Sequence, residues 1–542
     1  MTMIPKTAIL IIRIVLILSF SILLVRLFEL QIIRGNYYKE LANGNRLRRV
    51  IIKAPRGEIF ARGGEYLVKN DKENEFVLYK PDKGYYVSDS VSDGAERVSD
   101  VDTWERDYPL KASSAHITGY VGLVNESEVN KSDTACIGKG AHQATDEVGR
   151  SGLEEYYDCG LRGVDGEKLL EVNADGSYVR DLGQKDPVRG KDIKTTINYP
   201  LQEYVSTLLT GVRGVIIVGD AKGEILALYS SPSFDSNIFL SSSKKASEVL
   251  SDKDLPLFNR AVSGKYSPGS IYKPIVATAA LESGAIDKNY HYQDTGAVSF
   301  STIYGSYSFS NWYFTQYGGL EGSIDVVRAI ARSTDTFFYK VGELTGIEKL
   351  VEWSKLFGLA QKTGIDVPGE AIGLVPDPQW KEQTKGERWF LGNTYHLSIG
   401  QGDLEVTPIA IHNALSAIAN GGKLCVPRIV DDTKSESEIC SDLNIKDENI
   451  QTVKEGMLAA CSTGGTGYTF ADFKDKNGIE VACKTGTAQL GAVEETNAWF
   501  TAFAPFDDPQ IVVTVLIEEG GEGSKAAGPI ARQIFDFWFK KS

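Results

Sequence analysis

The sequence lacks any Cys-x-x-Cys pair, and its five histidines stand in no metal-ligand spacing. Zinc sites and dithiol redox sites need closely spaced ligands, so both classes of site are disfavoured. We therefore expect no metal and no cofactor. The six cysteines are far apart along the chain: Cys136, Cys159, Cys425, Cys440, Cys461 and Cys483. We interpret them as single thiols, although an oxidising compartment would permit a disulfide such as Cys425 with Cys440.

An excess of positive charge is also missing. Lysine and arginine total 58 against 72 aspartate and glutamate residues, which gives a formal net charge of -14. A general nucleic-acid-binding protein carries a basic face, so this balance argues against nucleic acid as a partner. The composition is otherwise ordinary for a globular protein, with 42% hydrophobic residues. The length of 542 residues leaves room for two or three domains.

Long apolar runs are absent except for one near the start. Residues 7–27 read TAILIIRIVLILSFSILLVRL, which suits a membrane-spanning helix of about 20 apolar residues. Arg13 lies near the start of the run, where a long side chain can reach the interface. A cleaved signal peptide is the alternative, but Arg26, Phe28 and Glu29 follow instead of the small residues of a cleavage site. We predict an uncleaved anchor, with the rest of the chain on one side of the membrane.

The sequence after the anchor falls into two parts. Residues 46–57 are basic and β-like, and residues 71–107 are polar and acidic, for which we expect short strands and long loops. From Lys194 onward the pattern indicates a larger folded domain. Apolar strands are predicted there at 213–219, 224–230, 479–483, 498–503 and 511–517. Helices are predicted at 201–209, 271–281, 324–331, 407–419 and 526–539. Strands from both ends of the segment around a helical middle predict an α+β domain, one antiparallel sheet with helices packed on it.

The first candidate for chemistry is Pro268-Gly-Ser-Ile-Tyr-Lys273. Proline and glycine make a turn, and the apolar residues that follow predict a helix that begins at about Ser270. Ser270 and Lys273 would then share one face of its N-terminal end. A serine hydroxyl needs an adjacent base, and a desolvated lysine near a second cation can lose its proton and serve as that base. Backbone N–H groups at the helix start could stabilise an oxyanion.

Two further pairs have the same Ser-x-x-Lys spacing: Ser241 with Lys244, and Ser242 with Lys245. They lie in a polar stretch with no turn before it and no apolar helix after it. We predict a solvated loop there and no catalytic role.

The second candidate is Ser333-Thr-Asp335, which lies between two predicted helices. A cluster of this composition is more often a helix cap than a catalytic element. If this cluster stood alone, we would interpret it as a cap.

The third candidate is Lys484-Thr-Gly-Thr487, directly after a predicted strand. Its lysine and two hydroxyls, on Thr485 and Thr487, would make a binding edge for a carboxylate, and Gly486 would let a ligand backbone approach closely. The same tripeptide at 362–364 lies in a predicted loop. The context therefore favours the later copy.

The ordered set of these three elements resembles the signature of penicillin-binding proteins and serine β-lactamases. The sequence around these motifs is similar to that of class B penicillin-binding proteins. The stretches that carry this resemblance are 56–57 with 62–64, 149–154, 231–237, 400–402 with 407–408, and 498–500. Residues 106–109 and 118–120 resemble the shorter, penicillin-binding protein A-like members. No stretch looks like a glycosyltransferase domain, which argues against the bifunctional class A type.

The resemblance implies an α+β protein with an N-terminal transmembrane helix, an extended mostly-β pedestal domain and a serine β-lactamase/transpeptidase-like domain. We expect the cytoplasmic N-terminus and anchor at 1–33, a pedestal or dimerisation-type domain at 34–194, and the penicillin-binding transpeptidase domain at 195–542. Such a protein crosses the bacterial cell membrane once, with its catalytic domain outside the cytoplasm. The implied partners are peptidoglycan stem peptides, β-lactams, the membrane, and a membrane glycosyltransferase of a division or elongation complex.

The resemblance also implies roles for single residues. Ser270 would attack the D-Ala–D-Ala carbonyl of a stem peptide and form an acyl-enzyme, with Lys273 as general base. Ser333 would relay a proton to the departing D-Ala. An amine from a neighbouring stem peptide would then take the acyl group. No metal or cofactor is implied.

Further implied roles concern substrate binding. Lys484, Thr485 and Thr487 would hold the terminal carboxylate of the substrate, beside Gly486. Backbone N–H groups of Ser270 and Thr487 would form the oxyanion hole.

The resemblance also places Asp335 among the substrate-binding residues. It departs from the pattern there, because the family usually has Asn at this position. An amide can donate a hydrogen bond to the substrate, and an ionised carboxylate cannot. A carboxylate beside Lys273 would also favour its charged form and make it a poorer base. The sequence therefore predicts that Asp335→Asn keeps or raises the acylation rate.

Two other functions fit the same residues. A D,D-carboxypeptidase or a β-lactamase would use the same serine and pass the acyl group to water. A non-catalytic scaffold or β-lactam sensor would work through the domain before Lys194, and Asp335 gives that reading some support. The presence of Ser270, Lys273, Ser333 and Lys484 in suitable contexts favours catalysis.

Overall fold

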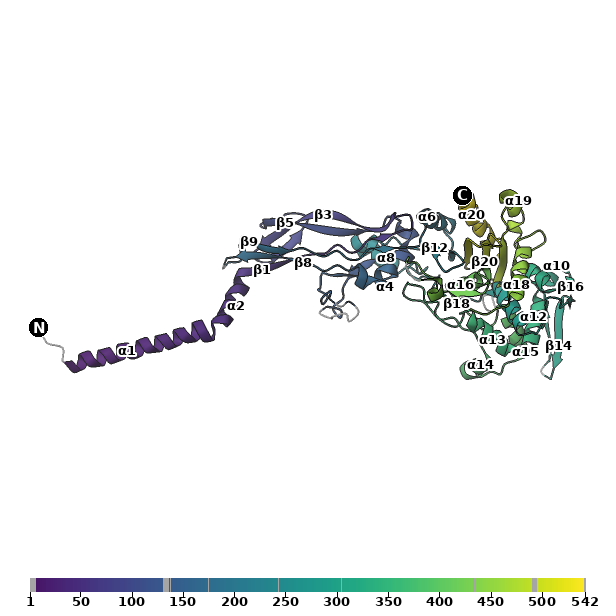
Figure 1. Cartoon of the computed structure of the whole chain (residues 1–542), viewed down its shortest axis with the longest axis horizontal. Helices are drawn as coiled ribbons and strands as arrows, with labels where there is room; N and C mark the ends of the chain where they lie inside the picture. The colour runs from purple at the N-terminus through teal and green to yellow at the C-terminus, as the bar shows by residue number, and fades with distance from the viewer. Residues whose placement is uncertain are drawn as a thin grey trace. The chain divides into compact units, whose positions relative to one another are not determined.

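The computed structural model describes residues 6–129, 136, 138–173, 175–241, 243–303, 305–431, 435–489 and 495–540 (Figure 1). Its contacts divide the chain into two compact units. The first unit contains Met1–Gly57, Asn70–Glu105 and Arg162–Lys191. The second contains Glu58–Lys69, Arg106–Leu161 and Asp192–Ser542.

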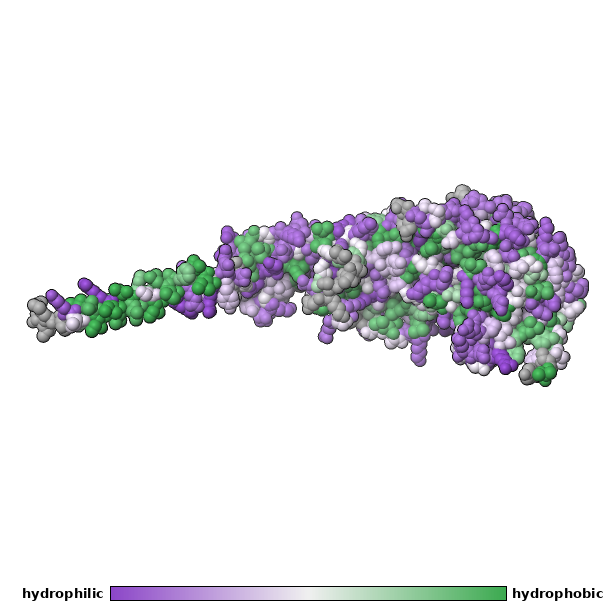
Figure 2. All heavy atoms as spheres, turned by 60° about the horizontal axis from the view of Figure 1, so that its bottom comes forward, coloured by the Kyte–Doolittle hydropathy of each residue, from purple (hydrophilic) through white to green (hydrophobic). Residues whose placement is uncertain are grey.

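The first unit begins with an apolar helix. α1 spans Lys6–Phe28 and continues as a π-helical turn, η1, over Glu29–Ile33, before α2 at Gly35–Arg46. None of the side chains of α1 is buried, and Figure 2 shows them as an almost continuous hydrophobic surface. Among the described residues, the segment Lys6–Ile33 is the one helix long and apolar enough to cross a membrane. The prediction of a long apolar helix is therefore confirmed.

The rest of the first unit is built from strands. β1 (Leu47–Ile52), β8 (Gly166–Val172) and β9 (Tyr178–Lys185) form a three-stranded antiparallel sheet. β3 (Tyr66–Lys80) pairs with β4 (Gly84–Ser88) and with β5 (Glu96–Asp107). A small apolar core joins these strands: Val50, Ile52, Val77, Val101 and Leu170.

The expectation of short strands and long loops for residues 71–107 is wrong. β3 has 15 residues and β5 has 12. Only a few positions, such as Val77 and Val101, are buried, while the remaining side chains of these strands are largely charged and exposed. Charged residues on the solvent side of a strand make its sequence look like a loop, because one face alone carries the apolar signal.

The second unit has a five-stranded antiparallel sheet at its centre. The strand order is β12 (Ile225–Ser231), β11 (Gly214–Gly219), β21 (Ile511–Ile517), β20 (Thr496–Ala504) and β19 (Ala482–Gln489). All four neighbouring pairs are antiparallel. The prediction of one sheet made from both ends of this segment is therefore confirmed.

Helices cover both faces of this sheet. Val215 and Ile217 of β11 join one apolar core, whereas Ile216 and Val218 join the other. The second core is closed by α6 (Tyr199–Leu208) and α20 (Ala527–Lys540), and Figure 1 shows α20 beside β20. Alternate residues of a strand point to opposite faces, so a strand covered on both sides is buried throughout, as all six residues of β11 are.

The middle segment is largely helical. Its helices are η3 (Gly269–Tyr272), α9 (Lys273–Glu282), α10 (Trp312–Tyr317), α11 (Val326–Arg332), α12 (Asp335–Thr345), α13 (Ile347–Leu356), α14 (Pro378–Lys385), α15 (Leu391–Ser398), α16 (Pro408–Ala419) and α18 (Asp447–Ala460). All of them except α10 and α14 contribute residues to the larger core. The predicted helices at 271–281, 324–331 and 407–419 correspond to α9, α11 and α16 within a few residues.

Shorter elements complete the second unit. The strands are β2 (Ile59–Phe60), β6 (Val121–Leu123), β7 (Glu147–Gly149), β10 (Ile193–Lys194), β13 (Tyr292–Asp294), β14 (Ala297–Thr302), β15 (Gly305–Ser310), β16 (Gly322–Ile324), β17 (Lys423–Cys425) and β18 (Cys440–Asp442). The helices are η2 (Lys111–Ser113), α3 (Ala115–Thr118), α4 (Gly152–Tyr156), α5 (Asp158–Leu161), α7 (Ile238–Ser241), α8 (Ser243–Leu250), α17 (Glu436–Ile439), η4 (Tyr468–Phe470) and α19 (Phe473–Asn477).

Two local predictions need correction. The polar stretch around Ser241 and Lys244 is helical, in α7 and α8, and Ser242 lies outside the described residues. Lys484-Thr-Gly-Thr487 lies inside β19 and not after it, because the strand continues through the motif. The earlier tripeptide copy at 362–364 lies in a loop, as predicted.

The interpretation of the cysteines as single thiols is wrong. The structure pairs all six as Cys136–Cys159, Cys425–Cys440 and Cys461–Cys483. The second pair connects facing positions of β17 and β18, and the third connects the end of α18 to β19. The paired cysteines are 15 to 23 positions apart in the chain, and only the tertiary fold brings them together. Their spacing in the sequence therefore did not indicate which cysteines form disulfides.

Candidate active site

Ser270 lies in η3, the 3₁₀ turn that leads directly into α9. Gly269 before it has a φ of +56°, a conformation that glycine adopts without steric cost. A Cβ atom on Gly269 would lie 2.7 Å from the carbonyl oxygen of Thr487, so glycine also allows η3 to lie against β19. Pro274 sits in the first turn of α9, where a missing N–H is tolerated. Ser270 is half-buried and Lys273 fully buried.

A glycine-containing loop holds η3 against the strand. The N–H of Gly269 donates to the Gly400 carbonyl at 2.8 Å, and the Gln401 amide donates to the Thr487 carbonyl at 3.2 Å. On the other side, the Trp499 indole N–H donates to the Ser267 carbonyl at 3.1 Å. These contacts give the 400–402 stretch a structural purpose, because it connects η3 to β19.

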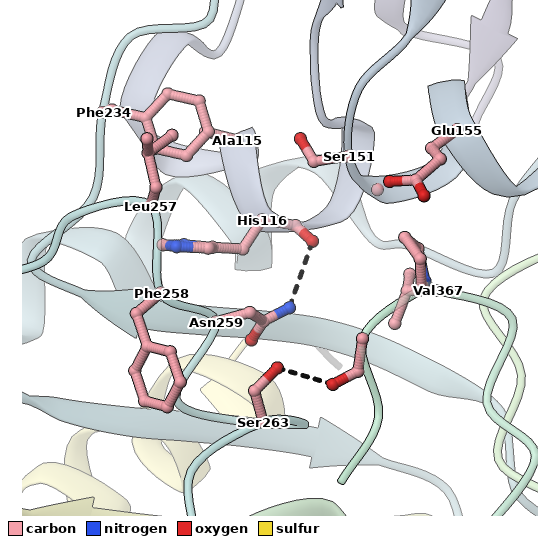
Figure 3. Close-up of a pocket in the computed structure, with 13 residues that line it drawn as sticks. Ala115, His116, Ser151, Glu155, Phe234, Leu257, Phe258, Asn259, Ser263 and Val367 are labelled. Carbon is pink, nitrogen blue, oxygen red and sulfur yellow. Dashed lines mark hydrogen bonds between the residues drawn. The ribbon is translucent and has the colours of Figure 1, made fainter. Parts of the chain in front are cut away.

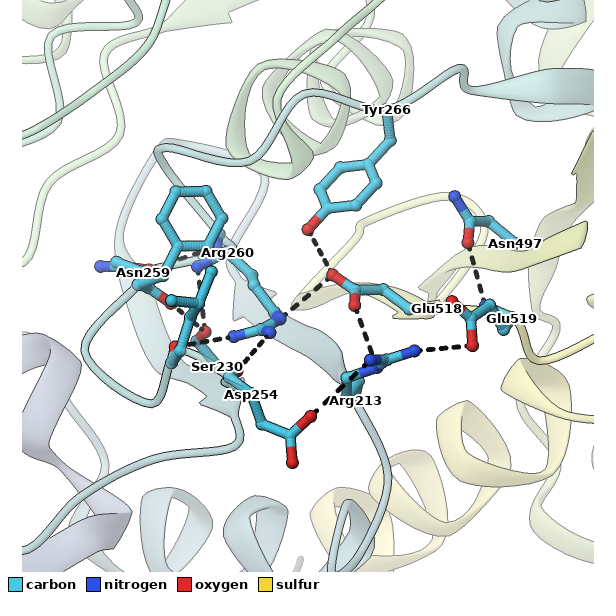
Figure 4. A network of polar contacts seen from close by, with 12 residues as sticks. Arg213, Ser230, Asp254, Asn259, Arg260, Tyr266, Asn497, Glu518 and Glu519 are labelled. Atoms are coloured by element: carbon cyan, nitrogen blue, oxygen red, sulfur yellow. Dashed lines mark hydrogen bonds and ion pairs between the residues drawn. The ribbon is translucent and has the colours of Figure 1, made fainter. Parts of the chain in front are cut away.

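The segment before Ser270 is anchored through Glu518, the residue that directly follows β21 (Figure 4). The Tyr266 hydroxyl donates to Glu518 Oε1 at 2.6 Å, and Arg260 Nε donates to the same atom at 3.1 Å. Arg213 lies 3.5 Å from the other oxygen of this carboxylate and also pairs with Glu519. Burial and the adjacent carboxylate raise the pKa of Tyr266, so its hydroxyl remains a donor at neutral pH.

Lys273 lies at the centre of the site. Its Nζ donates to the Ser333 carbonyl at 2.7 Å, approaches Ser333 Oγ at 3.2 Å and lies 2.6 Å from Asp335 Oδ1. Burial lowers the pKa of Lys273, and the Asp335 carboxylate opposes this shift. The amine is therefore a stronger candidate for a base at neutral pH than a solvated lysine.

Lys484 approaches Ser333 from the neighbouring strand. Its Nζ is fully buried, donates to Ser333 Oγ at 2.9 Å and donates to the Thr485 carbonyl at 2.9 Å. Burial, together with the charge of Lys273, holds the pKa of Lys484 well below its ordinary value. The Ser333 hydroxyl thus lies between two lysine amines, an arrangement suited to moving a proton.

The junction of α11 and α12 places Ser333 and Asp335. Ser333 ends α11 in the left-handed region, with φ of +56°, which is uncommon for a residue with a side chain. Asp335 opens α12, and its second carboxylate oxygen accepts the backbone N–H of Trp312 at 2.9 Å. Both oxygens of Asp335 are therefore engaged by donors of the protein itself. This geometry favours a role in positioning Lys273 over direct contact with a substrate.

The remaining predicted residues lie along β19. Thr485 donates its hydroxyl proton to Thr466 Oγ1 at 2.9 Å, and the Thr487 side chain is exposed. A Cβ on Gly486 would lie 2.9 Å from Ile271 Cγ2 and 3.0 Å from Trp499 Cβ. The space on the Cβ side of Gly486 is thus filled by the protein, so glycine is needed there for η3 to pack on β19.

The structure brings together most of the predicted site. Lys273, Ser333, Asp335 and Lys484 form one hydrogen-bonded cluster, and Ser270 begins the helical segment that carries Lys273. The sequence did not predict the contacts of Trp312 and Thr466, whereas Gln401 lies in the stretch 400–402 that carries part of the resemblance. Only the glycines around Thr466 could have drawn attention to it. Within the described ranges, no group of three or more His, Cys, Asp or Glu side chains could hold a metal ion.

A separate cavity of about 270 Å³ is lined by His116, Glu155, Phe234, Asn259 and other residues of the second unit (Figure 3). None of the predicted catalytic residues lines it. Burial lowers the pKa of His116 to about 4, so its ring is neutral at pH 7. This cavity is not the catalytic centre.

Comparison with known families and proteins shows which family this chain resembles. The family model for the penicillin binding protein transpeptidase domain matches residues 214–536, and the model for the penicillin-binding protein dimerisation domain matches residues 93–195. The peptidoglycan D,D-transpeptidase MrdA of Acinetobacter baumannii is 34% identical over 459 residues, which cover 80% of this chain and 66% of that protein. MrdA of Escherichia coli K12 is 32% identical, over 95% of this chain and 91% of that protein.

Solved structures of penicillin-binding proteins also match this chain. PBP2 of Helicobacter pylori, solved in complex with MreC, matches with a TM-score of 0.78 and 26% identity, over 92% of this chain and 99% of that one. A structure that describes the coordination of polymerization and crosslinking by a peptidoglycan synthase complex matches with a TM-score of 0.74 and 26% identity, over 99% of both chains. The transpeptidase match covers more than half of the chain and contains all three motifs, so the chain belongs to the class B penicillin-binding proteins, the family of peptidoglycan D,D-transpeptidases.

Proposed function

We propose that this transpeptidase cross-links peptidoglycan stem peptides through an acyl intermediate on Ser270. The observation that best supports the proposal is the position of the Ser333 hydroxyl, 3.2 Å from Lys273 Nζ and 2.9 Å from Lys484 Nζ. Burial lowers the pKa values of both amines, so each releases its proton more readily than a solvated lysine does. Such a set can activate a serine and return the proton to a leaving group.

In the acylation step, Ser270 Oγ attacks the carbonyl carbon of the D-Ala–D-Ala bond. Lys273, in its neutral form, accepts the proton of that hydroxyl. A bond forms between Oγ and the carbonyl carbon, and the oxyanion that results is held by the backbone N–H groups of Ser270 and Thr487. The C–N bond then breaks, and the proton passes through the Ser333 hydroxyl to the amine of the departing D-Ala.

The second step reverses the roles of the same groups. The amine of a neighbouring stem peptide attacks the acyl carbon and gives up one proton to the neutral Lys273. The C–Oγ bond breaks, and Ser270 recovers a proton as it leaves. The balance is one new peptide bond for the one that was broken, with D-Ala released. A β-lactam would acylate the same serine and block this second step.

Substrate binding is proposed for β19. Lys484, Thr485 and Thr487 would hold the terminal carboxylate of the donor peptide. Asp335, which the sequence placed among the substrate-binding residues, would act instead through Lys273, because both of its oxygens are already occupied.

We further propose that α1 anchors the protein as a single span of the bacterial cell membrane, with the catalytic domain outside the cytoplasm. Residues 1–33 would form the anchor, 34–194 the pedestal and 195–542 the transpeptidase domain. The chain would work with other wall-synthesis proteins, including a membrane glycosyltransferase. Its structural relatives in complexes with MreC and in a peptidoglycan synthase complex support this.

Intact-mass measurement after mixing the protein with benzylpenicillin tests the nucleophile. The parent should gain the mass of one penicillin, and Ser270→Ala should gain none. Ser241→Ala, which removes a serine of the same Ser-x-x-Lys spacing, is the matched control and should react like the parent. No adduct on a folded parent would instead favour a scaffold without catalysis.

A second assay separates cross-linking from hydrolysis. A pentapeptide donor is supplied together with a peptide that carries a free acceptor amine. A cross-linked product supports the transpeptidase, whereas release of D-Ala with only the shortened donor would mean that water takes the acyl group, as in a carboxypeptidase.

A further inference from the structure

The surface helix α14 is held to its domain by a lysine. It spans Pro378–Lys385 and lies at the outside of the second unit (Figure 1). Among its residues, all of which the structure describes, only Lys381 is buried, with 7% of its side chain exposed. Surface helices usually pack through apolar side chains, and a lysine is rarely buried unless it is paired. The burial of Lys381 therefore points to the partners of its amine.

The amine of Lys381 binds Asp403. Its Nζ donates to Asp403 Oδ2 at 3.2 Å and lies 3.1 Å from a carboxylate oxygen of the exposed Glu387. Lys385, one turn later on the same helix, binds the other oxygen of Asp403. Burial alone would lower the pKa of Lys381, but the two carboxylates outweigh this effect and raise it. Lys381 is thus a permanent positive charge beside Asp403.

Asp403 lies in the middle of a loop, residues 400–406, that runs along residues 266–269, the segment before the proposed nucleophile. At one end of the loop, the Gly400 carbonyl accepts the N–H of Gly269 at 2.8 Å. At the other end, Val406 and Tyr266 exchange two backbone hydrogen bonds, both of 2.9 Å. The loop is therefore bound to the nucleophile segment on both sides of Asp403.

The loop also connects η3 to β19 closely. A Cβ atom on Gly400 would lie 2.1 Å from a carbonyl oxygen of η3, so loop and turn are packed backbone to backbone. The Gln401 amide, two residues before Asp403, donates to the Thr487 carbonyl at 3.2 Å. The backbone N–H groups of Ser270 and Thr487 form the proposed oxyanion hole. A shift of Asp403 would therefore change the distance between these two groups.

We infer that Lys381 is a positioning residue: it fixes Asp403 and thereby the loop that sets the distance between Ser270 and Thr487. This inference rests on the proposed function, and it adds a residue that lies on a helix outside the three motifs. Lys381 contacts no reacting atom and acts through Asp403 and the loop. The oxyanion exists only in and near the transition state, so loss of Lys381 reduces the acylation rate constant and not the affinity for the ligand.

The test separates binding from acylation. Rapid-mixing kinetics of the whole chain with benzylpenicillin give the dissociation constant of the non-covalent complex and the acylation rate constant. Lys381→Met keeps the length of the side chain and removes its charge. It should lower the acylation rate constant about 10- to 100-fold, as expected for a misplacement of about 1 Å, and leave the dissociation constant nearly unchanged. Lys381→Arg restores the charge and should recover most of the rate.

Lys385→Met is the matched control, because it removes the other lysine from the same carboxylate at an exposed position. Exposed ion pairs contribute little, so its acylation rate constant should stay within about twofold of the parent. Asp403→Asn tests the same pair from the other side, also if Lys381→Met does not fold, and it should show the same selective loss of rate.

A double substitution tests the route through the loop. Gln401→Ala should itself slow acylation, and Lys381→Met should cost less in that variant than in the parent, because both changes act on one loop. The inference is overturned by an unchanged acylation rate constant in folded Lys381→Met, by an equal loss of affinity, or by full additivity with Gln401→Ala. The proposed function fails instead if Ser270→Ala is still acylated or the parent is not, so the two failures are distinguishable.

Discussion

The Asp335 carboxylate lies 2.6 Å from Lys273 Nζ. The two residues are 62 positions apart in the chain, and their contact acts on the basicity of Lys273, the proposed general base. Burial lowers the pKa of Lys273, whereas Asp335 raises it. The carboxylate therefore keeps the lysine from becoming too weak a base, and its other oxygen fastens Trp312 to the same site.

Asp335→Asn should move the acidic limb of the acylation rate to lower pH. In the proposed mechanism the neutral lysine is the base, so the rate falls as the pH drops below the pKa of Lys273. Removal of the carboxylate lowers that pKa further. The maximal rate should fall about tenfold, since the single amide oxygen cannot serve both Lys273 and the Trp312 N–H. Rate constants for benzylpenicillin measured across pH check both effects.

This expectation differs from the one drawn from the sequence, which was an unchanged or faster reaction. The difference comes from the second donor, Trp312, which only the structure reveals. An acidic limb that stays in place would mean that Asp335 does not set the pKa of the base.

Ser333→Ala should slow acylation by a factor of about 100 or more, the usual contribution of a positioned proton-transfer group. Both lysines remain, but the hydroxyl that connects them is gone. The adjacent Thr334→Val is the control, because the buried Thr334 hydroxyl has no hydrogen-bond partner in the described structure. Equal acylation rates for the two variants would show that the Ser333 hydroxyl takes no part in the proton transfer.

Replacing Cys461 and Cys483 by serine should lower the free energy of unfolding by about 3 kcal/mol, as expected for a cross-link that closes a loop of this size. It should also slow acylation, since Cys483 directly precedes Lys484. Denaturant unfolding and the benzylpenicillin rate measure the two effects. The same replacement of Cys425 and Cys440 is the comparison, and a slower acylation there as well would argue against a local effect on β19.

Tyr266→Phe should lower the free energy of unfolding by about 1–3 kcal/mol, because the half-buried Glu518 loses a donor. Urea unfolding at neutral pH measures this loss. Tyr468→Phe, at an exposed hydroxyl, should have almost no effect. A variant as stable as the parent would show that Arg260 and Arg213 satisfy Glu518 without the tyrosine.

Much of the fold can be predicted from the sequence, because its signals are local. The apolar run of α1, the five strands of the central sheet and helices such as α16 each follow from the order of neighbouring residues. The motifs at Ser270, Ser333 and Lys484 were found in the same way, since each is a short pattern in a suitable context. The strands at 71–107 were missed, because one buried face in a charged segment leaves a weak signal.

What the sequence determined by itself is therefore the set of elements, their order and the residue types available for chemistry. The tertiary structure alone decided which of these residues meet. It paired all six cysteines, placed Ser333 between Lys273 and Lys484, and brought Thr466 to the hydroxyl of Thr485. Such contacts join residues far apart in the chain, and they depend on how helices and strands pack, which no local pattern of side chains records.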